Sequence, residues 1–223
     1  MTQAIGKKLL TFRRYQDGDS QPDAWSEQIF QAGYTHKCPT YQKSTPPCQA
    51  SCPSGEDIRG YLAIARGTEK PPAGVPWQEY AWRRLTEANP FPAVMGRVCP
   101  APCEAGCNRN EVEDRVGINA VEHYLGDWAI KNGMTFEKPQ AATGKKVAVI
   151  GGGPAGLSCA YQLARMGHEV TVFDEHDELG GMMRYGIPGF RTPRDVLDAE
   201  IRRILDLGVK ARPKTRVGRD ITV

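Results

Sequence analysis

The sequence predicts a multidomain α+β protein: a mainly helical, loop-rich domain over residues 38–137 is followed by an α/β domain over residues 146–223. Two observations lead to this prediction. Six of the seven cysteines form two groups within the first half, where many of the prolines also lie. The second half opens with a strand-like run, a cluster of glycines and a helix-like segment, which is the order found at the start of a parallel sheet.

Three helices are predicted in the first domain, because apolar residues recur there at helical spacing. They cover residues 58–66, 77–88 and 116–131. Ser54 and Asp57 have the spacing of a capping box before the first helix. Gly67 and Gly133 are expected to end the first and the third helix.

The remaining segments define the organisation of the chain. Residues 1–37 mix aromatic and charged residues without a clear period, and we interpret them as an extension that packs on the helical domain or on a partner. Residues 138–145 are polar and are interpreted as a linker. With 29 basic and 26 acidic residues, the composition indicates neither nucleic-acid binding nor attraction to an anionic membrane. No apolar run reaches membrane-spanning length.

The grouped cysteines are candidate ligands of iron–sulfur clusters. Each group contains a Cys-x3-Cys pair beside proline, and thiolates are soft ligands that short loops can bring together around iron. Cys52-Pro53 resembles the end of a bacterial ferredoxin motif, in which the last cysteine binds the other cluster. The spacing therefore predicts two clusters that share the ligands Cys38, Cys48, Cys52, Cys99, Cys103 and Cys107.

Two other chemistries also fit six cysteines. Disulfides are typical of secreted proteins, but residues 1–12 do not form a signal peptide, so we expect a cytoplasmic protein. Zinc is the stronger alternative, since Cys99, Cys103 and Cys107 could bind one tetrahedral ion. However, zinc ribbons usually pair two Cys-x2-Cys knuckles, whereas here three-residue gaps recur beside prolines. The spacing favours iron–sulfur clusters over zinc.

A dinucleotide-binding motif opens the second domain. Lys146–Ile150 reads as a buried strand, and Gly151-Gly-Gly-Pro-Ala-Gly156 follows it directly. A helix is predicted over residues 157–166, then a second strand over residues 169–173 that ends at Asp174. Strand, GxGxxG, helix, strand and acidic residue thus occur in the required order.

The spacing assigns a role to each part of this motif. Gly151 allows the tight turn, Gly153 lets the backbone approach a pyrophosphate, and Gly156 lets helix and strand pack closely. The helix N-terminal amides would face the phosphates, and Asp174 would accept hydrogen bonds from ribose hydroxyls. The run Glu178-Leu-Gly-Gly181 places a second glycine turn soon after the acidic residue, which favours FAD as the dinucleotide.

Several runs resemble the small subunit of glutamate synthase and its relatives, which include the large subunit of NADH-dependent ferredoxin:NADP oxidoreductase and the N-terminal half of dihydropyrimidine dehydrogenase. The resemblance extends from Cys38 to the C-terminus and is carried by residues 89–92, 96–104, 118–127, 149–157 and 180–191. Within this superfamily, residues 38–48 look most like the DsrL branch, iron–sulfur flavoproteins that serve reverse dissimilatory sulfite reductase in sulfur oxidisers.

The resemblance implies a ligand set for one cluster. It would be bound by Cys52, Cys99 and Cys103, with a fourth ligand from the helix downstream. Relatives carry glutamine or glutamate at that position, and this sequence has Glu122. The alternative for Glu122 is a solvated carboxylate on the helix surface. A ligand other than cysteine is one way to tune the potential of a cluster.

The other cluster departs from the pattern of the relatives. It would take Cys48 and Cys107 with two cysteines upstream. Relatives show Cys-x2-Cys-x4-Cys there, which would place cysteines at Thr40 and Lys43, whereas this sequence offers only Cys38. Either Cys38 serves with an unusual fourth ligand such as His36 or a hydroxyl, or this cluster is incomplete.

For the flavin, the resemblance implies contacts from both glycine turns and from one arginine. The arginine fork would bind pyrophosphate or flavin oxygens, and its alternative is a surface arginine before a helix that begins near residue 193. The implied contacts are Gly151, Gly152, Gly153, Pro154, Ala155, Gly156, Asp174, Glu175, Gly180, Gly181, Met182 and Arg191.

The resemblance implies an electron-transfer oxidoreductase that moves electrons between NAD(P)H, FAD and two 4Fe-4S clusters, to or from a redox protein such as reverse dissimilatory sulfite reductase. Relatives continue with a second GxGxxG domain for NAD(P), so we expect this chain to be the N-terminal part of a longer enzyme. No catalytic residue is assigned. The alternatives are a glutamate synthase small subunit and a non-catalytic module stabilised by its clusters.

Overall fold

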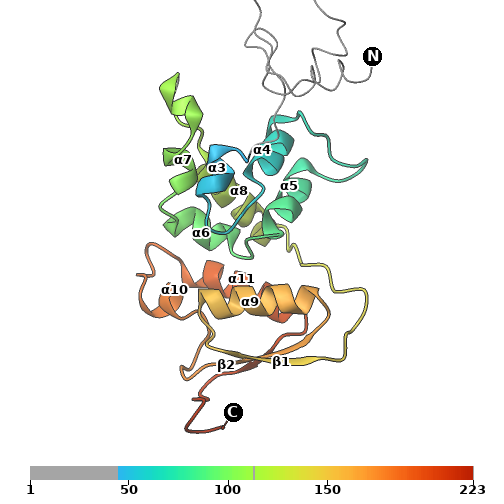
Figure 1. Cartoon of the computed structure of the whole chain (residues 1–223), viewed down its shortest axis with the longest axis vertical. Helices are drawn as coiled ribbons and strands as arrows, with labels where there is room; N and C mark the ends of the chain where they lie inside the picture. Colours follow the sequence, from blue (N-terminus) through green and yellow to red (C-terminus); the bar gives the residue numbers. More distant parts are fainter. Residues whose placement is uncertain (1–44, 113, 223) are drawn as a thin grey trace, which may run out of the picture. The chain divides into compact units, whose positions relative to one another are not determined.

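A computed structural model describes residues 45–112 and 114–222, and Pro46–Val223 form one compact unit. We call residues 46–131 of this unit its helical half and residues 146–222 its sheet half. Two helices of the sheet half, α9 (Pro154–Arg165) and α11 (Arg194–Leu205), lie between its strands and the helices of the helical half (Figure 1). The two halves therefore meet along helices.

The three helices predicted for the helical half are confirmed as α4 (Ile58–Arg66), α5 (Trp77–Thr86) and α8 (Ile118–Lys131). Gly67 and Gly133 follow α4 and α8 in the left-handed conformation expected of helix stops. The start of α4 differs from the prediction. Asp57, and not Ser54, is the N-cap, and its carboxylate accepts a hydrogen bond from the backbone of Gly60 at 3.1 Å.

Short helices that begin at proline complete the helical half. They are α3 (Pro47–Ser51), α6 (Pro92–Val98) and α7 (Pro102–Ala105), followed by a 3-10 turn, η1 (Asn108–Glu111). Proline suits the first turn of a helix, because its φ is already helical and its missing N–H would have no partner there. These helices are too short to show an apolar period, so the sequence predicted them as loops.

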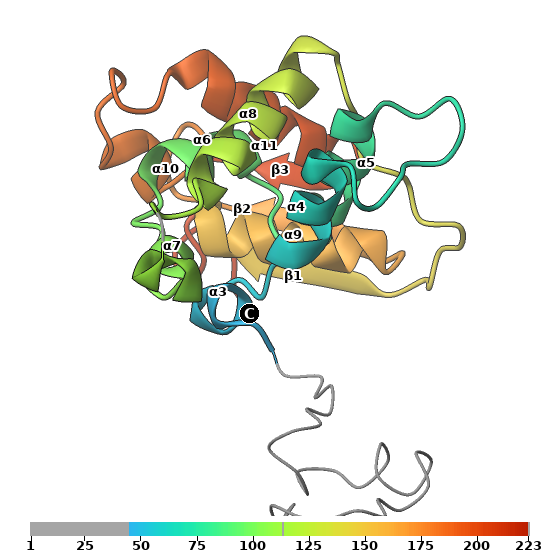
Figure 2. The same ribbon diagram turned by 90° about the horizontal axis from the view of Figure 1, so that it is seen from above.

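Helices α6 and α8 pack unusually closely through two glycines. A methyl group on Gly96 of α6 would overlap the backbone of His123 on α8, and one on Gly126 of α8 would overlap the backbone of Ala93 on α6. Each glycine thus makes room for the main chain of the other helix. The two helices form a tightly fitted pair, and this pair lies beside α11 (Figure 2).

The sheet half contains three parallel strands in the order β1 (Lys146–Ile150), β2 (Glu169–Phe173) and β3 (Lys210–Arg212). Strands β1 and β2 have the predicted bounds and pair in register from end to end, but β1 is not the buried strand that was predicted, since Val149 is the one buried residue of its five. Helix α9 begins at Pro154, three residues before the predicted start. Strand β3 and the short helix α10 (Met182–Tyr185) were not predicted.

Two hydrophobic cores stabilise the unit, and α6 contributes to the core of the sheet half. Phe91 and Val94 pack there with the buried faces of β2, α9 and α11. The other core joins α4, α5 and α8, and Cys103 is buried at its edge. Because α6 belongs to the helical half in sequence but to the sheet half in packing, it connects the two.

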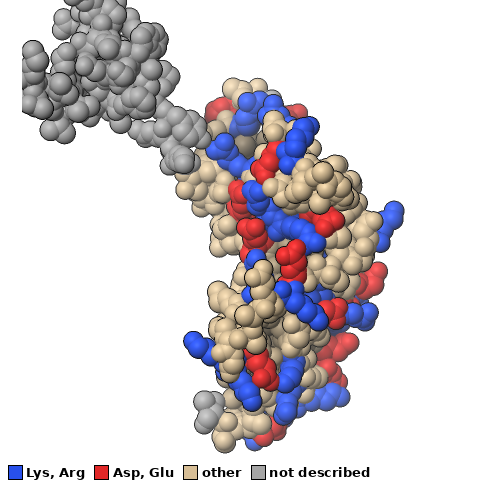
Figure 3. Space-filling model, turned by 90° about the vertical axis from the view of Figure 1, so that its right-hand side faces the viewer, with Lys and Arg blue, Asp and Glu red and all other residues tan. Residues whose placement is uncertain are grey.

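The described surface has the balanced charge that the composition indicated. Lys and Arg side chains are intermixed with Asp and Glu side chains on the face shown in Figure 3. Among the described residues, no helix has both the length and the apolar character needed to cross a membrane.

Candidate iron–sulfur and dinucleotide sites

Five of the six candidate thiols lie at or near the ends of the short helices, and all five are free. Cys48 is on α3 and Cys52 caps its C-terminus, Cys99 caps the C-terminus of α6, Cys103 is on α7, and Cys107 precedes η1. Helices α3 and α7 pack against each other, which brings the two sequence groups together. Cys38 lies outside the described residues.

The thiols separate electrostatically into two sets. Burial raises the pKa of Cys103 to about 11, and its neighbours Cys99 and Cys52 contribute to the rise. Burial also raises the pKa of Cys48, with a further contribution from Cys107. This is the division of thiols that the resemblance implies, although the ligand roles themselves stay a prediction. Partly buried thiols that disfavour one another's ionisation fit a positively charged iron group, which would neutralise their thiolates.

Two further observations around these thiols fit a cluster. Ala101, between Cys99 and Cys103, adopts a left-handed φ of 51°, and its N–H points at the Cys99 Sγ at 3.4 Å. The hydroxyl of Tyr61 is fully buried and has no hydrogen-bond partner among the described residues. It interacts electrostatically with Glu56, Glu122, Cys103 and Cys52. Sulfur atoms of a cluster are acceptors for such donors.

The thiols are not arranged around a single ion. Within residues 45–112 and 114–222, no three His, Cys, Asp or Glu side chains converge closely enough to hold one metal ion. The cysteines of an iron–sulfur cluster bind different irons and therefore stand farther apart than the ligands of one zinc ion.

Glu122 is buried beside the thiols and is only 6% exposed, so the alternative of a solvated carboxylate is wrong. Its Oε1 accepts a hydrogen bond from Asn89 Nδ2 at 2.7 Å, and the same nitrogen donates to Glu56 at 2.9 Å. Burial, followed by the proximity of Glu56, raises the pKa of Glu122 to about 9. The Glu122 carboxyl also interacts electrostatically with Cys99.

Glu56 was not identified from the sequence. It is buried like Glu122, and burial raises its pKa, partly offset by the hydrogen bond from Asn89. In the sequence it stands between turn residues just before α4, where an acidic residue is usually solvated. The pairing with Asn89 spans 33 residues, and no local pattern indicates it.

In the sheet half, the first glycine turn has the predicted geometry. Gly151 has a φ of 99°, and Gly153 is the residue before α9, so the helix amides face the turn. A methyl group on Gly156 would overlap the carbonyl oxygen of Gly151, which confirms the close packing of helix and turn. Pro154 occupies the first turn of α9, and Ala155 follows it.

Asp174 ties this turn to the end of β2. One carboxylate oxygen accepts from the Gly152 backbone at 2.6 Å, and the other accepts from the His176 backbone at 2.8 Å and from its ring at 3.0 Å. Burial opposes ionisation of Asp174, but these hydrogen bonds outweigh it and lower the pKa. An ionised carboxylate has further lone pairs, so Asp174 can still accept from a ribose.

A pocket of about 220 Å³ opens beside Asp174. It is lined by Gly151 and by residues at the ends of β1 and β2, including Glu175, which forms an ion pair of 3.4 Å with Arg216. The far wall is formed by Thr215, Arg216 and Val217. This wall was missed by the sequence prediction, because it follows the unpredicted strand β3.

The second glycine turn joins the first. The Gly180 N–H donates to the Gly152 carbonyl at 2.7 Å, and Gly181 lies against Gly153. Met182 then begins α10 with an exposed side chain. The structure thus brings the two predicted glycine turns together.

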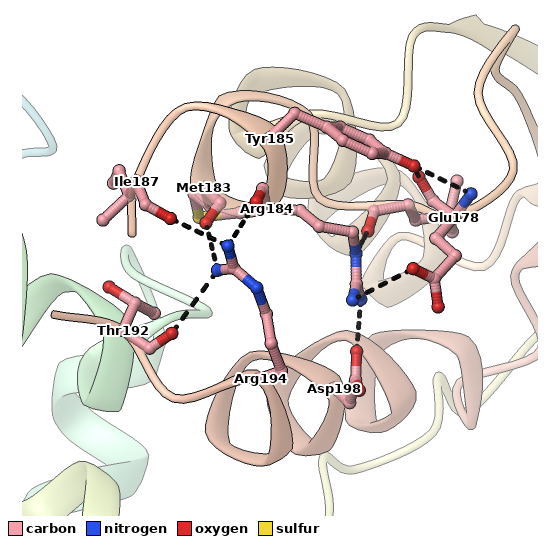
Figure 4. Close-up of polar contacts among 9 residues, drawn as sticks. Glu178, Met183, Arg184, Tyr185, Ile187, Thr192, Arg194 and Asp198 are labelled. Carbon is pink, nitrogen blue, oxygen red and sulfur yellow. Dashed lines mark hydrogen bonds and ion pairs between the residues drawn. The ribbon is translucent and has the colours of Figure 1, made fainter. Parts of the chain in front are cut away.

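Two arginines that the sequence did not identify hold the segment after the second glycine turn (Figure 4). Arg184 donates to the Leu179 carbonyl at 2.6 Å and pairs with Asp198 on α11. The guanidinium of Arg194 donates to four backbone carbonyls, at 2.5 to 3.4 Å, which belong to Met183, Arg184, Ile187 and Thr192.

Arg191 reaches the helical half. Its Nε donates to the carbonyl of Arg97 on α6 at 2.9 Å. The arginine predicted to bind the flavin is therefore anchored on the helix that leads to Cys99. Its flavin contact is not tested by this geometry and stays a prediction.

Comparisons with protein families divide the chain between the helical half and the sheet half, as the structure does. Residues 26–134 match the family described as dihydropyrimidine dehydrogenase domain II, 4Fe-4S cluster. Residues 149–208 match the family described as NAD(P)-binding Rossmann-like domain. The first match contains the helical half, and the second lies within the sheet half.

Curated relatives are similar to most of this chain. It is 37% identical over 202 residues to the NADP(+)-dependent formate dehydrogenase subunit beta of Moorella thermoacetica, covering 80% of this chain and 27% of the relative. It is 39% identical over 178 residues to the glutamate synthase (NADPH) small chain of Mycobacterium tuberculosis, covering 79% and 35%. It is 36% identical over 188 residues to the NADPH-Fe(3+) oxidoreductase subunit beta of Geobacter sulfurreducens, covering 81% and 26%.

These relatives are much longer than the matched region. The chain spans between 26% and 35% of their lengths. Together the comparisons and the fold show a helical iron–sulfur domain, similar to dihydropyrimidine dehydrogenase domain II, followed by the start of a parallel-sheet, Rossmann-like domain.

Proposed function

We propose that this chain forms the cluster- and flavin-binding part of an NAD(P)-linked iron–sulfur flavoprotein that transfers electrons. The observation that carries the proposal is the placement of both candidate sites in one compact unit, with α6 packed into the core of the sheet half and ending at Cys99. The printed names of the relatives, which include an NADPH-Fe(3+) oxidoreductase subunit and an NADPH glutamate synthase small chain, support this class of activity.

Different residues are assigned to each of the two clusters. We assign one 4Fe-4S cluster to Cys52, Cys99 and Cys103 with Glu122, and a second to Cys48 and Cys107 with Cys38. When bound, FAD would supply two-electron chemistry with pyridine nucleotides, and the clusters would supply one-electron chemistry. Within the first set, Cys103 is buried in the core that joins α4, α5 and α8, and Cys52 packs against that core.

The glycine turns are assigned to FAD. Their backbone amides and the start of α9 suit a pyrophosphate, and the pocket beside Asp174 suits the adenosine part of a dinucleotide. The run from Glu178 to Gly181 supports FAD, whereas the description of the matching Rossmann-like family names NAD(P). We therefore propose that pyridine-nucleotide turnover belongs to a longer protein that contains this chain.

The cofactor content tests the proposal directly. Anaerobically reconstituted protein should contain up to about eight irons with matching sulfide per chain, and it should retain FAD. Stoichiometric zinc without sulfide would contradict the cluster assignment. Tight binding of NADPH with no affinity for FAD would show that the glycine turns bind a nicotinamide cofactor instead.

A finer proposal concerns the partner. The resemblance of residues 38–48 to the DsrL branch supports reverse dissimilatory sulfite reductase as the redox partner in sulfur oxidation, with a glutamate synthase small subunit as the alternative. Most of that run lies outside the described residues. Electron transfer from the reduced protein to purified sulfite reductase, compared with transfer to a glutamate synthase large subunit, would decide between them.

A further inference from the structure

Glu200 links α11 of the sheet half to α6 of the helical half. Its side chain is 0% exposed, and its two carboxylate oxygens accept hydrogen bonds from consecutive backbone amides. Oε1 accepts from Ala93 at 2.8 Å and Oε2 accepts from Val94 at 3.0 Å. These amides lie in the first turn of α6 and have no partner within the helix. One buried carboxylate thus satisfies two orphan donors across the domain interface.

The helix held in this way ends at a candidate cluster ligand. Cys99 is the C-cap of α6, and its N–H donates to Met95 within the helix. At Ala93 the same helix contacts Gly126 so closely that no side chain fits between them. Glu122 lies on α8, one turn before Gly126. A displacement of α6 would therefore move Cys99. It would also disturb the close packing of α6 against α8, the helix that carries Glu122.

The sheet half holds α6 near its other end as well. Arg191 donates to the Arg97 carbonyl at 2.9 Å, and the partly buried Val98 packs against the core of the sheet half. The two polar contacts come from segments on either side of the start of α11. Both ends of α6 are thus positioned by the half that carries the glycine turns.

A carboxyl group is chemically suited to this position, and its amide analogue is not. Both backbone amides need an acceptor, and each oxygen of Glu, ionised or protonated, keeps a lone pair that can accept. Gln has nearly the same size but would present an NH2 group to one of the two N–H groups. Glu200 to Gln therefore removes one hydrogen bond and creates a clash of donors without leaving a cavity.

We propose that Glu200 is a positioning residue that fixes α6, and with it Cys99 and its cluster, relative to the flavin-binding half. The proposal rests on the proposed function for the identity of the bound groups. The contact between Glu200 and α6 is independent of it. Glu200 touches neither cofactor and acts through the backbone of α6.

The first test measures the contact itself. Hydrogen–deuterium exchange of the full chain should show that Glu200→Gln weakens protection of the amides in residues 93–98 by about tenfold, the effect of one buried hydrogen bond. Asp195→Asn is the control, because Asp195 is an exposed carboxylate on the same helix. Equal protection of residues 93–98 in both variants would overturn the proposal.

The second test measures the cluster. In reconstituted protein, Glu200→Gln should retain full iron, sulfide and FAD but change the electron paramagnetic resonance line shape of the Cys99 cluster, and Glu200→Asp should restore it in part. A fully loaded variant with an unchanged spectrum would refute the positioning role. A wild-type chain that takes up neither iron nor FAD would instead contradict the proposed function, while the exchange experiment would still decide the Glu200 contact.

Discussion

Asn89 donates a hydrogen bond of 2.7 Å to the carboxyl of Glu122, and this amide also reaches Glu56 on the opposite side. The Asn89 carbonyl oxygen accepts from the Phe91 backbone at 2.9 Å, so the side chain is held in one orientation just before α6. Two buried carboxyl groups thus share one donor beside the thiols. This polar centre is built from three segments that lie far apart in the sequence.

Asn89→Asp should strongly destabilise the protein. The substitution removes the shared donor and places a third carboxyl group against two buried ones. A buried group left without its hydrogen bond costs about 1–3 kcal/mol, and more when it is charged. Urea unfolding measures the change. Gln140→Glu, the same amide-to-acid change at an exposed position, is the control and should change stability by less than about 0.5 kcal/mol. Equal effects of the two substitutions would contradict this account.

Glu122→Ala should shift or abolish the electron paramagnetic resonance signal of one cluster and leave the other. The expected reason is that Glu122 supplies the fourth ligand beside Cys99, whereas the second set of thiols does not include it. Glu137→Ala is a suitable control, since that side chain is 81% exposed. Unchanged spectra and iron content in the Glu122 variant would exclude it as a ligand.

Tyr61→Phe should lower the reduction potential of the cluster bound by Cys52, Cys99 and Cys103. The Tyr61 hydroxyl is buried without a partner among the described residues, and burial raises its pKa, so it remains a neutral donor. A donor to cluster sulfur favours the reduced, more negative state. Loss of about 1 kcal/mol corresponds to roughly 40 mV for one electron. A redox titration with unchanged midpoint would show that the hydroxyl does not reach the cluster.

The stability of the metal-free chain should fall as the pH rises from about 5 to 8, and Glu200 should account for part of the fall. Burial raises the pKa of Glu200 to about 7 from an ordinary value of 4.5, against the opposing effect of its amide donors and of Arg203 and Arg97. The folded state therefore retains a proton that the unfolded state releases, and this stabilisation is lost as the pH rises through 7.

Denaturant unfolding at several pH values would measure the effect. Glu200→Gln should make the free energy of unfolding fall less steeply between pH 5 and pH 7, by a slope that corresponds to about one proton. Glu122 and Glu56 have raised pKa values and contribute in the same direction. Because Glu200 also helps to raise the pKa of Glu122, the difference between variant and wild type reports Glu200 together with its effect on Glu122. An identical slope in the two proteins would show that Glu200 does not titrate in this range.

The parts of the fold that were predicted are those that carry a local pattern. Strands β1 and β2 are continuous β-branched and apolar runs bounded by glycine or by charged residues, and their predicted bounds were correct. Helices α4, α5 and α8 repeat apolar residues over at least two turns. Helix α6 has only seven residues, which is too few to show an apolar period. Its position depends on glycine contacts with α8 and on Glu200, and no local sequence pattern predicts these contacts.

In the candidate sites, too, the residues with a local sequence pattern were predicted and the others were missed. The cysteines and the first glycine turn were found because sulfur ligands and glycines are rare residue types with characteristic spacing. Glu56 and Glu200 were missed because an acidic residue near a helix is usually solvated. Their burial depends on partners that are 33 and 107 residues away. Sequence spacing predicts which atoms bind a group, but the residues that position those atoms emerge only from the packing.

Gly156→Ala should weaken FAD binding while leaving the iron content unchanged. The added methyl group would overlap the Gly151 carbonyl oxygen and push α9 away from the turn that must approach the pyrophosphate. Gly189→Ala is the matched control, because a methyl group there meets no atom within 4 Å. Flavin fluorescence titration should show a dissociation constant raised at least about tenfold in the first variant and unchanged in the second. If Gly156→Ala bound FAD like the wild type but lost affinity for NADPH, the glycine turn would serve a nicotinamide cofactor, and the pocket beside Asp174 would have to be reassigned with it.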